Sequence, residues 1–158
     1  MKMTGIAVSG GFHYKDNTQY VGTWDSSGKP HGEGHLSFSD GMRYSGCFEN
    51  GKFNGLGVLV FPDGARYEGE FHKGWFHGYG TFWRSDNMRY EGEFRGGQIS
   101  GLGIMTFNDG TNGFPRHEGF FRNTRLIEPR RCPDIVDRAQ KLSFMARNKY
   151  FNILYSEN

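Results

Sequence analysis

Hydrophobic and polar positions alternate along several short segments of this chain. In residues 67–71, Tyr-Glu-Gly-Glu-Phe, two aromatic residues and a glycine occupy every second position, and two glutamates fill the others. A period of two is typical of a β-strand with one buried face. The segment is therefore predicted to be a strand with an aromatic face and a glutamate face.

The same pattern repeats along the chain at a period of about 23 residues, which is within the range of solenoid repeats. Copies are found at residues 20–24, 44–48, 67–71 and 90–94, with a degenerate fifth copy at 117–121. Each of the first four copies is followed by a Gly-x-Gly segment, at residues 32–34, 55–57, 78–80 and 101–103. Turn-forming pairs then follow at Asp40-Gly41, Asp63-Gly64, Asp86-Asn87 and Asp109-Gly110. Each repeat is therefore predicted to be a β-hairpin.

Stacked hairpins of this kind predict an all-β fold, an extended single-layer antiparallel sheet over residues 11–128. Aromatic rings of one strand would lie over glycines of its neighbours, where no side chain blocks them. An α-helical repeat is excluded, because each glycine in a helix interior costs about 1 kcal/mol and every repeat contains several. Residues 1–10 are predicted to be an N-terminal tail, and the insertion at 109–116 a protruding loop.

The last part of the chain, residues 129–158, follows a different pattern. Glycine is absent from it, Pro129 and Pro133 interrupt the chain, and apolar residues recur at spacings of three and four. This spacing predicts a linker and then an amphipathic helix that begins near Pro133. We expect the helix to pack on the aromatic face of the sheet and to form one wall of a groove there.

Composition and candidate chemistry narrow the function. The net charge is +2, with both signs mixed along the chain, so no basic field for nucleic acid is present. Cys47 and Cys132 are expected to be free thiols, and the six histidines lack the spacing of a zinc site. With no long apolar segment either, these patterns predict a cytoplasmic, monomeric protein that is not an enzyme and has no cofactor or metal.

The Tyr-Glu-Gly-Glu-Phe segment, the Gly-x-Gly segment and the closing Asp-Gly turn together resemble the membrane occupation and recognition nexus (MORN) repeat, over residues 11–127. Details of the turn at 84–88, the insertion at 113–119 and the C-terminal helix are similar to the retinophilin subgroup of that family. Retinophilins associate with class III myosins in actin-based cell projections. The resemblance therefore implies a peptide from a class III myosin tail as the partner.

The aromatic face is the candidate partner-binding site, because a run of open rings would exceed the largest apolar patch of an ordinary monomer. This holds if about a third of the ring area stays open; for a single ring, cover by neighbouring rings and by the curvature of the sheet is the favoured interpretation. The candidate residues are Tyr20, Trp24, Tyr44, Phe48, Tyr67, Phe71, Phe82, Arg84, Tyr90, Phe94 and Phe107, with Phe38 and Phe61 on the same face. Arg84 replaces the phenylalanine of the other repeats and could clamp a peptide carboxylate or reach into solvent.

Two clusters of charged residues suggest further functions or surfaces. Arg122, Arg125, Arg130 and Arg131 form a basic cluster that could bind acidic headgroups, which makes a peripheral phospholipid-binding module the second candidate function. Glu68, Glu70, Glu91 and Glu93 form an acidic column on the glutamate face. We expect this column to be solvated, because most surface charges are.

Overall fold

The computed structural model describes residues 8–108 and 115–155 of the 158-residue chain and contains one sheet and one helix. The strands are β1 (Val8–His13), β2 (Gln19–Trp24), β3 (Pro30–Ser37), β4 (Arg43–Glu49), β5 (Lys52–Val60), β6 (Arg66–His72), β7 (Trp75–Trp83), β8 (Arg89–Arg95), β9 (Gln98–Thr106), β10 (Arg116–Arg122) and β11 (Arg125–Pro129). The helix is α1 (Pro133–Tyr155). The predicted all-β fold with a C-terminal helix is confirmed.

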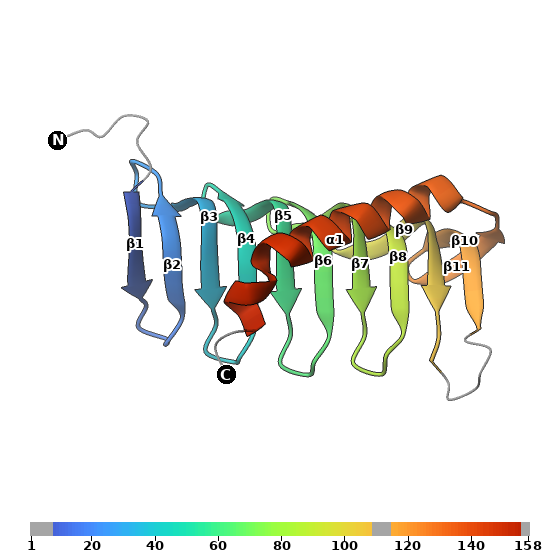
Figure 1. Cartoon of the computed structure of the whole chain (residues 1–158), viewed down its shortest axis with the longest axis horizontal. Coiled ribbons are helices and arrows are strands. Elements are labelled where there is room, and N and C mark those ends of the chain that lie inside the picture. The colour runs from blue at the N-terminus through green and yellow to red at the C-terminus, as the bar shows by residue number, and fades with distance from the viewer. Residues whose placement is uncertain (1–7, 109–114, 156–158) are drawn as a thin grey trace.

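The sheet is an open antiparallel meander in which every strand pairs with its neighbours in sequence (Figure 1). The predicted turns at Asp40-Gly41, Asp63-Gly64 and Asp86-Asn87 close hairpins as expected. In the turn at 61–65, the Asp63 carboxylate accepts a hydrogen bond from the Ala65 backbone N–H at 2.9 Å. Of the loop predicted at 109–116, residues 109–114 lie outside the described residues, and Arg116 is the first residue of β10.

A row of glycines crosses the whole sheet at one register position. Gly46 faces Gly57, which faces Gly69, which in turn faces Gly80, and the row continues in both directions to Gly10 and Gly119. Side chains are excluded from this row by close backbone contact. A methyl group added at Gly69 would lie 2.5 Å from the Cα of Gly80. The glycine content of the chain is therefore a packing requirement of the sheet.

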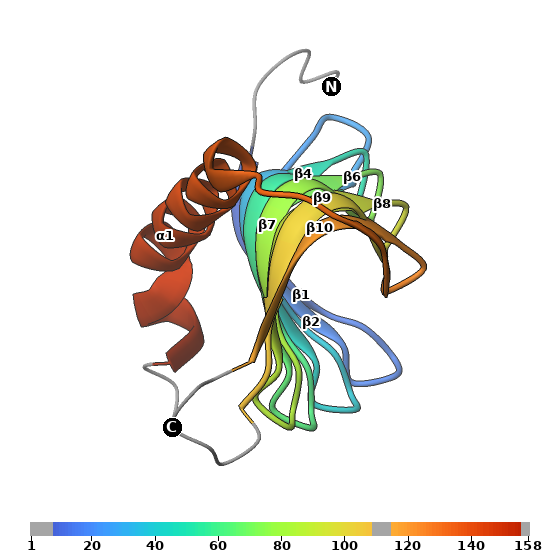
Figure 2. The same cartoon turned by 90° about the vertical axis from the view of Figure 1, so that its right-hand side faces the viewer.

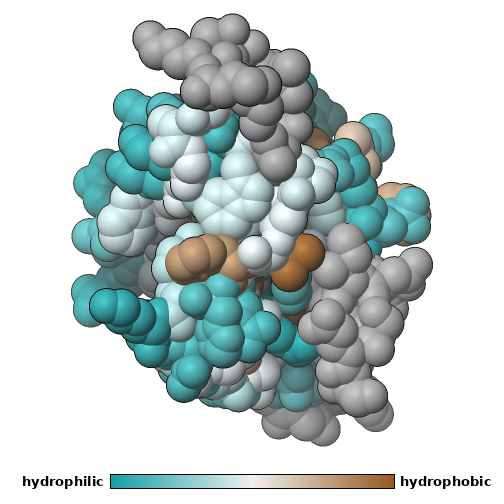
Figure 3. All heavy atoms as spheres, turned by 90° about the vertical axis from the view of Figure 1, so that its left-hand side faces the viewer, coloured by the Kyte–Doolittle hydropathy of each residue, from teal (hydrophilic) through white to brown (hydrophobic). Residues whose placement is uncertain are grey.

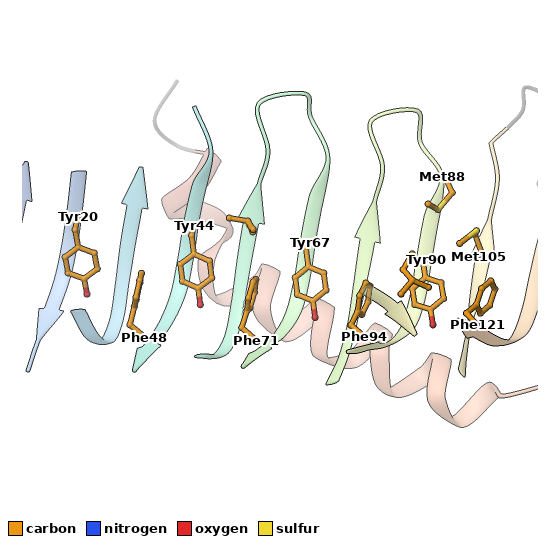
Figure 4. Packing of buried hydrophobic residues seen from close by; sticks show 12 residues of the cluster. Tyr20, Tyr44, Phe48, Tyr67, Phe71, Met88, Tyr90, Phe94, Met105 and Phe121 are labelled. Atoms are coloured by element: carbon orange, nitrogen blue, oxygen red, sulfur yellow. The ribbon is translucent and has the colours of Figure 1, made fainter. Parts of the chain in front are cut away.

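One tyrosine per repeat lies across this glycine row (Figure 4). Its hydroxyl donates a hydrogen bond to a backbone carbonyl three residues later, as Tyr44 does to Cys47 and Tyr67 does to Glu70, both at 2.7 Å. Burial raises the pKa of both tyrosines, which keeps the hydroxyls protonated as donors. A methyl group at Gly57 or Gly80 would lie 2.5 Å from one of these hydroxyl oxygens.

The first glycine of each Gly-x-Gly segment bends the sheet. Gly55, Gly78 and Gly101 have φ of +88°, +90° and +114°, a region that glycine enters without steric cost. The register shifts at these positions, between Gly46 and Phe48 for example, are β-bulges. Bulges bend strands and increase their twist. Because a bulge recurs in successive repeats, the strands curl together and the aromatic face becomes concave (Figure 2).

The rings on the concave face form the core. Edge-to-face contacts join rings within a repeat and between repeats: the ring centroid of Tyr44 lies 5.1 Å from that of Phe48 in its own repeat and 5.1 Å from that of Phe71 in the next, and Tyr67 lies 5.0 Å from Phe94. A second ring layer covers the first. The ring of Phe53 stacks on that of Tyr44 with 3.8 Å between centroids, and Phe76 stacks on Tyr67 with 4.1 Å between centroids. One layer of sheet thereby obtains a hydrophobic core without a second sheet opposite it.

The helix begins at Pro133 as predicted, but it packs on the other face of the sheet. It contacts β4 to β9 on the glutamate-bearing, convex side, and the concave side stays open (Figures 1 and 2). Ala146 and Tyr150 pack there against Val58. The expectation of a helix over the aromatic face was wrong: the rings there cover one another, whereas the convex face offers the helix the apolar side chain of Val58 and the acceptors Glu68 and Glu91.

The glycine row leads to a prediction about stability. Gly80→Ala would force a methyl group against the Tyr67 hydroxyl at 2.5 Å and should destabilise the protein by about 3 kcal/mol or more. Gly10→Ala, in the same row on edge strand β1, has only the Trp24 indole nitrogen nearby, at 3.9 Å. It should change stability by less than about 1 kcal/mol. Urea unfolding measures both, and equal effects would show that the row is not close-packed.

Candidate binding groove

The concave face contains two hollows, one in each half of the array. The larger, of about 600 Å³, is lined by Tyr14, Lys15, Asp16, Thr18, Pro30, Leu36, Phe38, Phe48 and Gly51. The smaller, of about 350 Å³, is lined by Phe76, Phe82, Arg84, Met88, Phe94, Gly97, Gln98, Ile99, Asn123 and Thr124. Each hollow is bordered both by the turns within repeats and by the turns between repeats. Together the hollows mark a groove between two rims of turns.

Seven of the predicted contact residues form the floor beneath this groove. Their side chains are between 0% and 4% exposed: Tyr20, Tyr44, Phe48, Tyr67, Phe71, Tyr90 and Phe94. For these seven rings the interpretation of mutual cover is confirmed, because edge-to-face packing and the curvature of the sheet leave far less than a third of their area open. Phe48 and Phe94 still reach the walls of the two hollows.

The accessible aromatic surface belongs to residues at the rims. Trp24, Phe82 and Phe107 are half-buried, as are Phe38 and Phe61. Phe38 lines the larger hollow and Phe82 the smaller one.

Sequence reasoning missed the second ring layer, Phe53 and Phe76, and also Tyr14 and Ile99. The sequence does contain a signal for the second layer: Phe53 and Phe76 occupy the same position in successive repeats, just after the turn between repeats.

Arg84 lies at the mouth of the smaller hollow and is held by its own turn. Its Nε and Nη2 donate to the two carboxylate oxygens of Asp86 at 2.8 and 2.7 Å. This ion pair lowers the pKa of Asp86 to about 2, so the pair is charged at neutral pH. The guanidinium is therefore oriented by Asp86 and reaches into solvent. A peptide in the hollow would meet a positioned hydrogen-bond donor.

In the acidic column on the convex face, Glu68 and Glu91 are buried and Glu70 and Glu93 are half-buried, contrary to the expectation of a solvated column. Glu68 is 0% exposed, and one of its oxygens accepts hydrogen bonds from Ser143 Oγ at 2.9 Å and Arg147 Nε at 3.0 Å. Arg66 Nε lies 3.2 Å from the other oxygen. Glu91 accepts a hydrogen bond from Gln140 Nε2 at 2.8 Å. Glu68 and Glu91 therefore attach the helix to the sheet. The alternating pattern of the strands does not indicate this role, because it separates the two faces without showing what packs on them.

The other two glutamates of the column stabilise the bulges. The Glu70 carboxylate accepts a hydrogen bond from the Tyr79 backbone N–H at 2.7 Å, and that of Glu93 from the Leu102 N–H at 2.6 Å. Both amides follow the positive-φ glycine, where the ladder is interrupted and a donor would otherwise lack a partner. The glutamate face thus maintains the curvature on which the groove depends.

Other candidate chemistry is limited. Cys47 Sγ lies 3.4 Å from the Tyr150 hydroxyl, and Cys132 is buried; both thiols are free. Within residues 8–108 and 115–155, no three His, Cys, Asp or Glu side chains are arranged to hold a metal ion. In the same part of the chain, no helix combines the length and the apolar character needed to cross a bilayer.

An open sheet of repeated hairpins with a hollowed concave face is the architecture of a repeat-type binding module. The MORN repeat model matches residues 20–43, 44–66, 67–89 and 90–112. The chain is 66% identical, over 145 residues, to the MORN repeat-containing protein 4 homolog of Drosophila melanogaster, an alignment that covers 92% of this chain and 73% of that protein. The chain therefore belongs to the MORN repeat family, whose repeats mediate protein or membrane interactions.

The buried Glu68 leads to a second prediction. Glu68→Ala should destabilise the protein by about 1–3 kcal/mol, because Ser143 and Arg147 lose their acceptor in a buried site. Glu68→Gln keeps an acceptor oxygen without a charge and should cost less. Urea unfolding at neutral pH compares them, and equal losses would show that Glu68 does not bind the helix through hydrogen bonds.

The pH dependence of the same variants supplies a control. Desolvation raises the pKa of Glu68 above 4.5 in the folded protein, although Arg66 and Arg147 oppose it. The folded state therefore binds the proton more tightly than the unfolded state does. As the pH falls through the folded-state pKa towards 4.5, the wild type should gain stability relative to Glu68→Gln. A loss of relative stability in this window would contradict the assignment.

Proposed function

We propose that this protein is a non-enzymatic adaptor whose concave groove holds a peptide segment of a partner protein, and that the segment comes from a class III myosin tail. The observation that carries the proposal is the pair of hollows on the concave face. Both are walled mainly by apolar and aromatic side chains and contain a few polar groups, which is typical of ligand sites in proteins.

The groove supports an elongated ligand rather than a compact one. Its hollows lie in opposite halves of an array whose strands are spaced by about 4.8 Å. Phe38 belongs to the turn after β3 and Phe82 to β7, so the two rings are about four strands, or roughly 20 Å, apart. An extended peptide rises by about 3.3 Å per residue, and some six residues would link the two rings.

The helix on the convex side stiffens the sheet, which favours peptide binding on the concave side. A single-layer sheet would flex if only hairpin contacts joined its repeats. The helix contacts six successive strands and is attached through Glu68 and Glu91, so these repeats are held in one curvature. A groove shaped before binding loses less conformational entropy when a peptide enters.

The myosin assignment is supported by resemblance to the retinophilins, and the geometry is compatible with a tail peptide. The apolar walls suit apolar side chains of such a segment, and Arg84 suits a carboxylate or a backbone carbonyl. The phospholipid alternative has some structural support as well, because Arg122, Arg125, Arg130 and Arg131 are all exposed near the β11 end of the sheet.

The experiment measures binding of class III myosin tail fragments by calorimetry. Phe38→Ala and Phe82→Ala remove half-buried rings from the two hollows and should each weaken binding about tenfold or more. These rings are better targets than Phe71 and Phe94, which are 4% exposed and whose loss would destabilise the fold.

Phe144→Ala is the matched control, because Phe144 is 61% exposed on the helix, away from the groove. Binding should be unchanged in this variant. Unchanged binding in the two groove variants would place the partner elsewhere. If salt-sensitive binding to acidic vesicles is lost when Arg130 and Arg131 are replaced by Glu, while tail fragments do not bind, the lipid function is favoured instead.

A further inference from the structure

The convex face carries a row of arginines that the groove does not use. The repeat places Arg43, Arg66, Arg89 and Arg116 at one register position on β4, β6, β8 and β10. The intervening strands contribute Val60, Trp83 and Thr106 between successive arginines. Neighbouring arginines are therefore about 10 Å apart across one strand, and the residue between them determines what the gap contains.

The three gaps differ. Val60 fills the first with an apolar side chain, and it packs with the group that holds Ala146 and Tyr150 of the helix. Trp83 fills the second, with the Arg66 guanidinium 4.1 Å from its ring centroid. The third, between Arg89 and Arg116, has Thr106 as its floor. A hollow of about 240 Å³ lies there, lined by Trp83, Asn87, Arg89, Thr106, Asn108 and Arg116.

Of the two arginines that line this hollow, Arg89 is paired with a glutamate of its own repeat and Arg116 is not. Arg66 pairs with Glu68 and Arg89 with Glu91, in each case two residues later. The corresponding Glu118 instead accepts a hydrogen bond from the Cys132 backbone N–H at 2.7 Å, beside the start of the helix. Within residues 8–108 and 115–155 the structure shows no ion pair for Arg116. The hollow has no carboxylate among its lining residues.

We infer that this hollow is a binding site for a phosphomonoester dianion. Guanidinium groups bind phosphate oxygens through paired N–H donors, and Arg89 has N–H groups beyond the Nε that contacts Glu91. Arg116 supplies the second cation from the opposite side of Thr106, whose hydroxyl can donate a hydrogen bond. The ligand would lie on the convex face, on the side of the sheet opposite the peptide groove.

The test titrates the full chain with inorganic phosphate and with O-phosphoserine at constant ionic strength, followed by calorimetry and by the backbone amide NMR signals of Asn87 and Thr106. Saturable binding of both probes, with these signals shifting, is expected. Arg116→Gln should weaken binding about tenfold or more. Thr106→Val should weaken it as well, and it should fold normally, because Val60 occupies the corresponding position between Arg43 and Arg66.

Arg125→Gln is the control, because it removes an exposed arginine from β11 outside the hollow and should leave binding unchanged. An equal loss in Arg125→Gln would show nonspecific attraction to a basic surface and would overturn the site. Absence of saturable binding at millimolar concentrations of either probe would do the same. Binding of inorganic phosphate that O-phosphoserine does not displace would overturn the phosphomonoester assignment.

Discussion

The structure depends on the close contact between one tyrosine per repeat and the glycine row beneath it. The ring can lie flat across two strands only because neither strand has a side chain there, and its hydroxyl then reaches a backbone carbonyl. This contact buries a large ring completely in a sheet only one layer thick. It also removes the need for a second sheet, so one face remains available for function.

Curvature follows from the same repeat and is maintained from the opposite face. Glycines of positive φ allow a bulge in successive repeats, and Glu70 and Glu93 satisfy the amides that the bulges leave without ladder partners. Glu68 and Glu91 then attach the helix across the strands. Burial opposes ionisation of Glu68, but Arg66 on the sheet and Ser143 and Arg147 on the helix contact its carboxylate. These contacts fix the position of the helix on the sheet. The acidic residues of the repeat thus hold the bulges and the helix in place and are not simply solvated surface charges.

The two faces of the sheet therefore carry different structural features. The concave face has a floor of buried rings that stabilise the fold and half-buried rings at its rims, Phe38 and Phe82 among them, that line the hollows. The convex face holds the helix and, beside it, the row of arginines.

The sequence by itself determined the hairpin repeat, its register, the glycine row and the start of the helix at Pro133. These features depend on local periodicity and turn chemistry, which the order of residues expresses directly. The face on which the helix packs, the burial of Tyr67 and Glu68, and the hollows were decided only by the tertiary structure. Alternation separates two faces of a strand but does not reveal the direction in which a bulged sheet curls. Curvature decides which rings cover one another and which face is left for the helix.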